Sequence, residues 1–212
     1  MSLQDDILNY SERHSSPELS ILTKIYRETH VRLLNPRMVS GHIQGKLLSM
    51  LSHMIKPECI LEIGTFTGYS AICLAQGLLP NGKLHTIEIN DELGDIALKY
   101  FKEADLGDKI MLHIGNALEI VPQINMQFDL IFIDGEKREY PEYYNVCMEH
   151  LKPGGYLLAD NVLWDGKVVE TLALEETTTK AILEFNNIVQ KDNRVENVLL
   201  PFRDGLTIVR RI

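Results

Sequence analysis

Four polar side chains in the second half of the chain have types and spacing that could support metal-assisted acid–base chemistry. Asp134 follows one apolar run, and Asp160 and Asn161 follow a later one. Their carboxylate and amide oxygens suit a hard cation such as Mg²⁺, Mn²⁺ or Ca²⁺. Lys137 lies close after Asp134; a nearby cation would disfavour its ammonium, lower its pKa and make it a candidate general base. Taken singly, each acid could equally cap a loop, and a lone lysine is usually a surface residue.

A second candidate site is Leu61–Ser70, where an apolar run ends in an acidic residue and a glycine turn before a helix-like segment. Such a junction is where α/β proteins bind nucleotide-like cofactors. A dinucleotide fingerprint needs G-x-G-x-x-G, but Phe66 takes the middle position and leaves only Gly64 and Gly68. Glu62 adds negative charge that would repel phosphate and suit a cation. The loop therefore favours S-adenosylmethionine, which has a sulfonium and no phosphate, although a plain turn of an α/β domain would show the same glycines.

An acidic residue at the end of the next predicted strand fits the same cofactor. The run Lys83–Ile89 alternates in the manner of a strand and carries Glu88 near its end. A carboxylate about 20 residues beyond the glycine loop commonly accepts hydrogen bonds from ribose hydroxyls. Glu88 is therefore predicted to hold a ribose, the alternative being a solvated acid at a strand end.

Apolar patterning predicts the elements that would position these residues. The first fifty-odd residues look helical, with one helix opening at Ser16-Pro17-Glu18 and another over Ile43–Ile55. From Cys59 strands and helices alternate, which predicts an α/β fold with a mostly parallel sheet covered on both faces. The predicted strands are Cys59–Ile63, Leu84–Ile89, Ile110–Ile114, Phe128–Ile133, Tyr156–Ala159, Val195–Leu200 and Leu206–Arg210. The predicted helices are Ser70–Leu79, Glu92–Ala104, Ala117–Val121 and Tyr140–Leu151.

The predicted topology brings the polar residues to one edge. Ligands in open α/β sheets lie beyond the carboxyl ends of the strands. If the strands before Asp134 and Asp160 are neighbours, their ends lie about 5 Å apart and the metal-ligating oxygens converge. The last two strands flank the short loop Pro201–Gly205, so they must run antiparallel.

Composition limits the classes of function. The 212 residues are 45% hydrophobic and 24% charged, which predicts one globular domain with a substantial core. We find no apolar run near the ~20 residues that span a bilayer, and the polar N-terminus is unlike a signal peptide. Three widely spaced cysteines indicate buried free thiols in a reducing cytoplasm. The net charge of −9 disfavours tight nucleic-acid binding. We therefore expect a cytoplasmic protein without a membrane partner.

Several segments together resemble the cation-dependent O-methyltransferases, the family that includes catechol and caffeoyl-coenzyme A O-methyltransferases, and the bacterial and caffeoyl-coenzyme A branch in particular. The similarity runs from about Met38 to Ile212. The matching segments are Leu61–Ser70, Phe128–Lys137 with Tyr140, Leu151–Asn161 with Trp164, and Asp204–Thr207. Met38–Ser40 with Gln44 and Gly45 also resembles the segment that closes over the cofactor in that family.

The resemblance implies a Rossmann-like class I S-adenosylmethionine-dependent methyltransferase fold, with a seven-stranded, mostly parallel sheet, an antiparallel C-terminal hairpin and helices on both faces. It implies one domain over residues 1–212, in which 1–57 form a helical segment over the cofactor and acceptor sites and 58–212 form the α/β core. It also implies a homodimer and a small hydroxylated acceptor with two adjacent oxygens, methylated on one of them.

The resemblance also implies a role for each site residue. The metal ligands would be Asp134, Asp160 and Asn161, and the catalytic residues would be Lys137, as the base, and Asp134. The residues contacting S-adenosylmethionine would be Val39, Glu62, Gly64, Tyr69, Ser70, Glu88, Ala117 and Asp134, with Glu88 on the ribose and Ala117 on the adenine. Trp164 as an aromatic wall and Arg203 as a cation are candidates for contacting the acceptor; their alternatives are a packing tryptophan and a solvated loop cation.

The sequence departs from the family pattern in two loops. Family members often carry Asp-Ala-Asp-Lys where this chain has Asp134-Gly135-Glu136-Lys137, which keeps the metal and base positions. The usual Gly-Asp-Gly of the last loop is Arg203-Asp204-Gly205 here.

Three other functions compete with small-molecule O-methylation. Some bacterial relatives methylate a hydroxylated uridine in transfer RNA, which the net charge disfavours. A nucleotide-dependent oxidoreductase is disfavoured by Phe66 in the glycine loop. A non-catalytic binder of S-adenosylmethionine is disfavoured by the intact Lys137 and metal ligands.

Overall fold

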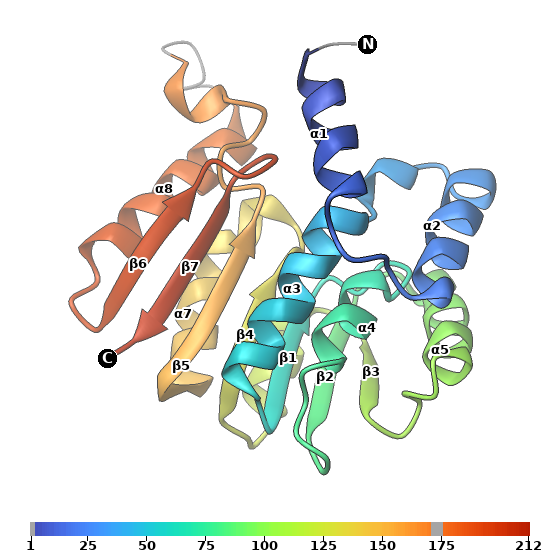
Figure 1. Ribbon diagram of the computed structural model, residues 1–212. Coiled ribbons are helices and arrows are strands. Elements are labelled where there is room, and N and C mark those ends of the chain that lie inside the picture. Colours follow the sequence, from blue (N-terminus) through green and yellow to red (C-terminus); the bar gives the residue numbers. More distant parts are fainter. Residues whose placement is uncertain (1–2, 171–175) are drawn as a thin grey trace.

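A seven-stranded sheet forms the centre of the molecule in the computed structural model, which describes residues 3–170 and 176–212 (Figure 1). Its order is β3-β2-β1-β4-β5-β7-β6. The strands are β1 Cys59–Ile63, β2 Lys83–Glu88, β3 Ile110–Ile114, β4 Phe128–Ile133, β5 Leu151–Asp160, β6 Val195–Leu200 and β7 Leu206–Arg211. This confirms the predicted seven-stranded sheet; β4 and β5 are neighbours, which the sequence had left as a condition, and β5 begins at Leu151, earlier than the predicted Tyr156.

The direction of the strands also follows the prediction. The pairs β1–β2, β1–β4, β2–β3 and β4–β5 are parallel, whereas β7 runs antiparallel to both β5 and β6. The C-terminal hairpin is therefore confirmed. Because Ile133 pairs with Ala159, the two strands before Asp134 and Asp160 end side by side.

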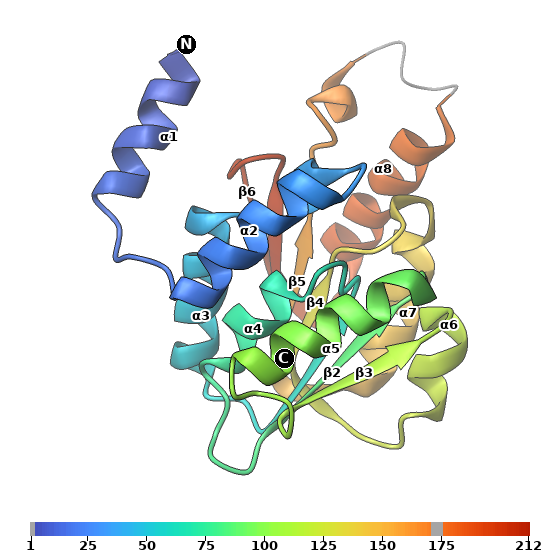
Figure 2. The ribbon, with the colours of Figure 1, turned by 90° about the vertical axis from the view of Figure 1, so that its right-hand side faces the viewer.

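Helices cover both faces of the sheet and enclose two hydrophobic cores. Figure 1 shows α3 and α4 on the near face and α7 and α8 on the far face. Successive side chains of a strand point into alternate cores: Ile60 packs with the near helices, and Leu61 packs with the far ones. The helices are α1 Leu3–Arg13, α2 Ser20–Arg32, α3 His42–Ile55, α4 Tyr69–Ala75, α5 Gly94–Glu103, α6 Ala117–Ile120, α7 Tyr140–His150 and α8 Thr177–Lys191. Figure 2 shows α1 standing away from the remainder of the fold.

One predicted helix start is wrong. The segment Ser16–Glu18 is not helical, and α2 begins only at Ser20. Tertiary contacts hold the segment outside the helix: His42 and Lys46 bind the carbonyls of Ser16 and Pro17 at 2.8 and 3.1 Å. The Glu18 carboxylate accepts a 2.5 Å hydrogen bond from Tyr69. These partners come from α3 and α4, so the local proline signal was overridden by packing.

Two further helices differ from expectation. Helix α8 was not predicted, although its buried Ala181, Ile182, Phe185 and Val189 have helical spacing. Helix α4 ends at Ala75, earlier than the predicted Leu79. A side chain at Gly77 would overlap the backbone of α3, so this close approach explains the glycine just after the helix.

All three cysteines are buried and free, as predicted. Within the part of the chain that the structure describes, we find no helix long and apolar enough to cross a membrane.

A pair of histidines on β2 and β3 makes stability depend on pH. His85 Nδ1 and His113 Nε2 lie 3.0 Å apart, and burial lowers the pKa of both rings below 6.5, with the charge of His113 adding to the effect on His85. At mildly acidic pH the two histidines therefore bind protons more readily in the unfolded chain than in the folded protein. Stability should be fully present above about pH 6.5 and fall as the pH decreases.

Replacing His113 with glutamine should flatten this acid dependence, because one of the two resisting rings is removed. The measurement is the free energy of unfolding in urea between about pH 5 and 8, the range in which histidine titrates. His30→Gln, at an exposed position of α2, is the matched control and should keep the wild-type slope. An unchanged slope for His113→Gln would refute the assignment.

Candidate active site

A cavity of about 1020 Å³ opens at the carboxyl ends of the parallel strands, where the sequence placed the site. Every predicted site residue except Glu62 lines it: Val39, Gly64, Tyr69, Ser70, Glu88, Ala117, Asp134, Lys137, Asp160, Asn161, Trp164 and Arg203. Residues from the N-terminal segment and from the β6–β7 loop therefore share one space with the strand ends. The structure thus brings together groups that are far apart in the sequence.

The glycine loop between β1 and α4 is shaped by its contacts with neighbouring strand ends. Gly64 has a φ of +101°, and a Cβ there would overlap the carbonyl oxygen of Asp134. The Phe66 amide donates a 2.7 Å hydrogen bond to Glu88 Oε2, and the Asn90 amide donates to Oε1 at 2.9 Å. Backbone donors thus fix the Glu88 carboxylate at the cavity wall. A carboxylate has about four acceptor sites, so it can still accept hydrogen bonds from a diol.

Glu62 lies beneath the cavity and does not line it. Its side chain is fully buried (0% exposed), because β1 is a central strand. Oε2 accepts a 2.6 Å hydrogen bond from Thr86, whose hydroxyl lies 2.5 Å from that of Thr65. Burial raises the pKa of Glu62 to about 8, with Asp134 and Glu88 adding to the effect. Through Thr86 the Glu62 carboxylate is connected to Thr65 of the glycine loop, and a hydrogen bond from Ser70 favours its charged form.

Lys137 is held by two partners at the cavity wall. Its Nζ donates to Asp134 Oδ1 at 2.7 Å and to the Tyr140 hydroxyl at 2.9 Å. Burial disfavours the lysine charge, but the negative charge of Asp134 and the two hydrogen bonds outweigh it and raise the pKa of Lys137 above its usual range. In the chain by itself Lys137 is therefore an ammonium. The lower pKa expected from the sequence concerns a metal-loaded site.

The second acid of the site, Asp160, is almost completely buried, at 6% exposed. Its Oδ2 accepts a 2.6 Å hydrogen bond from Gln44 Nε2, and its main-chain oxygen accepts one from Tyr140 at 2.9 Å. Burial raises the pKa of Asp160 to about 6, and the charge of Asp134 adds to the rise. The negative charge of Asp160 is thus disfavoured by its burial and by the neighbouring Asp134. Asn161 follows in the left-handed region, at a φ of +57°, which asparagine tolerates better than most residues.

These residues fit a divalent cation by the chemistry of their donors. The buried carboxylate of Asp160 and the partly exposed carboxylate of Asp134 would both gain from a shared cation, and hard cations prefer oxygen ligands. Among residues 3–170 and 176–212 we find no cluster of three His, Cys, Asp or Glu side chains suited to a metal. The candidate set is instead two carboxylates and the amide of Asn161, which excludes a soft thiolate or imidazole site here.

Trp164 and Arg203 lie on the cavity wall beyond the two acids. Trp164 has a φ of +49°, and Lys167 Nζ lies 6.0 Å from its ring centroid. Arg203 Nη1 donates hydrogen bonds to the Ser40 carbonyl and to Gln44 Oε1. Arg203 is therefore tied to the N-terminal segment, whereas the sequence left open a solvated loop cation.

Gln44 is a residue of the site for which no separate role was predicted from the sequence. It lies on the buried stripe of α3 together with Leu48 and Ser52, at spacings of four residues. A long polar side chain on an otherwise buried stripe was the available signal, because buried polar groups need partners.

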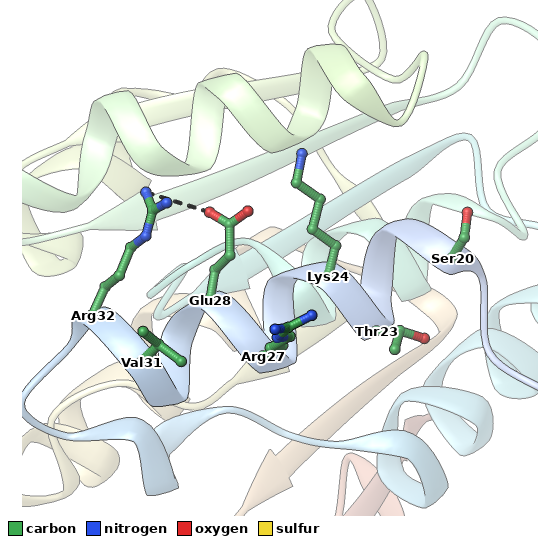
Figure 3. A pocket seen from close by; sticks show the side chains of 7 residues that line it. All are labelled: Ser20, Thr23, Lys24, Arg27, Glu28, Val31 and Arg32. Carbon is green, nitrogen blue, oxygen red and sulfur yellow. Dashed lines mark ion pairs between the residues drawn. The ribbon is translucent and has the colours of Figure 1, made fainter.

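A second hollow, of about 580 Å³, runs along α2 (Figure 3). Its lining residues are Ser20, Thr23, Lys24, Arg27, Glu28, Val31 and Arg32. All belong to this one helix, and Glu28 is engaged by Arg32 at 3.5 Å and by the Tyr100 hydroxyl at 2.9 Å. No predicted site residue contributes, so we place the chemistry in the larger cavity.

Comparison with known proteins identifies the family that this chain resembles. A family profile described as O-methyltransferase matches residues 12–212. Caffeoyl-CoA O-methyltransferase 1 of Eucalyptus globulus is 35% identical over 188 residues, covering 82% of this chain and 75% of the relative. A catechol O-methyltransferase of Niastella koreensis is 35% identical over 161 residues, covering 74% of this chain and 72% of the relative.

Two solved structures share the fold over almost the whole chain. An O-methyltransferase from Bacillus cereus in complex with SAH has a TM-score of 0.91 at 29% identity and covers 96% of both chains. The O-methyltransferase TomG from Streptomyces achromogenes, in complex with SAM, has a TM-score of 0.91 at 28% identity, covering 100% of this chain and 99% of its own.

Proposed function

The chain belongs to the O-methyltransferase family, and on that premise we propose that it transfers a methyl group from S-adenosylmethionine to a hydroxyl of a small, catechol-like acceptor with two adjacent oxygens, with the help of a divalent cation. The observation that carries this proposal is the single cavity shared by the Gly64 loop, Glu88, Lys137 and the acid pair of Asp134 and Asp160. A methyl-donor site and a metal-and-base site therefore open into one space.

The cofactor half of the cavity fits S-adenosylmethionine, which supplies a methyl group on a positively charged sulfur. Glu88 would accept the ribose hydroxyls, because its carboxylate is already oriented by the amides of Phe66 and Asn90. Gly64 leaves room beside the Asp134 carbonyl, where a side chain would not fit. Val39, Tyr69, Ser70 and Ala117 would complete the pocket, and Glu62 would support its floor.

The metal half of the cavity would be formed by Asp134, Asp160 and Asn161. A cation held by these oxygens would acidify an acceptor hydroxyl and orient the adjacent oxygen. Lys137 Nζ, which lies at the cavity wall, would release its ammonium proton to solvent and then, as the neutral amine, receive the hydroxyl proton. Because the pair with Asp134 favours the ammonium form, any weakening of that pair would make Lys137 a better base. The chain otherwise contributes orientation and charge placement.

The acceptor would lie against Trp164 and near Arg203, which together offer an aromatic face and a cation. We also propose a homodimer, as the family resemblance implies.

The function is tested by incubating the protein with labelled S-adenosylmethionine, Mg²⁺ and a panel of hydroxylated acceptors, including catechol, caffeoyl-coenzyme A and transfer RNA from a strain lacking the gene. Label on a vicinal-oxygen small molecule supports the proposal, and label only on transfer RNA would overturn the acceptor class.

Glu88→Gln should weaken binding of S-adenosylmethionine by about 10- to 100-fold, because a hydrogen bond to a charged acceptor contributes about 1.5–3 kcal/mol. Calorimetric titration of the donor without acceptor measures this directly. Glu58→Gln, at an exposed position before β1 and at the opposite end of the sheet, should bind as the wild type does. Equal affinities of the wild type and Glu88→Gln would remove Glu88 from the cofactor site.

A further inference from the structure

A buried amide connects three distant segments beside the candidate metal site. Gln44, in the first turn of α3, is 2% exposed and lines the cavity. Its Nε2 donates to Asp160 Oδ2 at 2.6 Å, and its Oε1 accepts from Arg203 Nη1. The same guanidinium nitrogen donates to the Ser40 carbonyl. The N-terminal segment, the end of β5 and the β6–β7 loop therefore meet at this one side chain.

An amide is the side chain best suited to this position. It offers a donor and an acceptor at its two ends, so a carboxylate on one side and a guanidinium on the other are both satisfied. A glutamate would satisfy Arg203 but repel Asp160. An apolar side chain would leave a buried carboxylate oxygen without its partner, at the cost of desolvation.

The amide also keeps the positive charge of Arg203 one side chain away from Asp160. A guanidinium that contacted a carboxylate directly would form a strong charge-assisted pair and compete with any cation for that oxygen. Gln44 instead fixes the orientation of Asp160 with a neutral donor. Asp160 therefore has no guanidinium bound directly to it, and we find no side chain of the described residues hydrogen-bonded to its Oδ1.

We propose that Gln44 is a positioning residue that presents Asp160 to the divalent cation and couples this ligand, through Arg203, to the Ser40 segment and the β6–β7 loop. The inference rests on the proposed function, since it assigns the cation to Asp160. It predicts that Arg203 influences metal affinity without contacting the metal. It further predicts that the effects of Gln44 and Arg203 are not additive, because they act through the same hydrogen bond.

The test is the affinity for Mn²⁺, measured by calorimetry without acceptor and therefore independently of turnover. Gln44→Met keeps the length of the side chain and should weaken Mn²⁺ binding by about 10- to 100-fold, the usual effect of removing a partner that orients a metal ligand. Arg203→Met should weaken it less, and should add nothing in the Gln44→Met background. Ser52→Ala, on the same helix as Gln44, is the matched control: it removes a buried hydrogen bond of 2.6 Å to the Leu74 carbonyl of α4, and should leave Mn²⁺ affinity unchanged.

The outcomes separate this inference from the proposed function. Wild-type affinity for Mn²⁺ in folded Gln44→Met would refute the positioning role alone. Absence of Mn²⁺ binding by the wild type would refute the metal proposal and this inference with it. If Gln44→Met does not fold, the Arg203→Met variant decides, because its substitution lies in a loop: an unchanged Mn²⁺ affinity would overturn the coupling, and a reduced one would support it.

Discussion

Lys137→Met is expected to lose about 10²- to 10⁴-fold in turnover, the range that a general base typically contributes, while binding S-adenosylmethionine with unchanged affinity. Nζ of Lys137 lies at the wall of the shared cavity and makes its hydrogen bonds to Asp134 and Tyr140, neither of which belongs to the glycine loop. Removing it therefore removes the proton acceptor and leaves the cofactor half intact. Single-turnover methyl transfer and calorimetric titration of the donor measure the two quantities separately.

The chain offers a matched control for this substitution. Lys152 makes the same kind of pair with Asp129, also at 2.7 Å, but outside the cavity. Lys152→Met should therefore remove an equivalent ion pair and keep wild-type turnover. A Lys137→Met variant that turns over as fast as Lys152→Met would show that Lys137 is not the base.

Asp160→Asn should abolish the response to divalent cations and at the same time leave the metal-free protein as stable as the wild type, or more so. The wild-type carboxylate is buried and faces Asp134, so its charge is unfavourable without a cation, whereas the amide carries no charge. We expect Mn²⁺ to raise the melting temperature of the wild type, because a ligand at 100 times its Kd stabilises by about 2.7 kcal/mol. The variant should show no such rise, and methyl transfer should fall at least about 100-fold, as expected for loss of a metal ligand.

Asp192→Asn is a control that should change the stability of the metal-free protein in the opposite direction. Asp192 is paired with Arg194 at 2.7 Å, and its hydrogen bond from Arg194 lowers its pKa. Its substitution should destabilise the protein and preserve the response to Mn²⁺. A wild-type Mn²⁺ response in Asp160→Asn, or a destabilised metal-free protein that resembles Asp192→Asn, would contradict the role of Asp160.

Much of this site follows from the sequence because strand ends are set locally. The run before Asp134 and the run before Asp160 are apolar, and the turns after them are polar, so both strands and their ends could be predicted. The alternation of strands and helices then placed the carboxyl ends on one edge of the sheet. The glycine loop was predictable for the same reason, since Gly64 adopts a positive φ, a local backbone conformation that favours glycine.

The remaining features depend on contacts between distant segments. The hydrogen bond of Gln44 to Asp160 spans 116 positions, and that of Arg203 to Gln44 spans 159, so no local pattern specifies either. Glu62 was expected to contact the cofactor, and the complete burial of its side chain depends on which strands flank β1. The start of α2 was likewise decided by contacts from α3 and α4.

The central claim, a cation-dependent methyl transfer, is tested most directly by the rate of label transfer from S-adenosylmethionine to catechol with and without chelator. We expect transfer with Mg²⁺ or Mn²⁺, loss of transfer in excess chelator, and recovery when the metal is restored. An undiminished rate in excess chelator would contradict the assignment of Asp134, Asp160 and Asn161 as the site of a required cation.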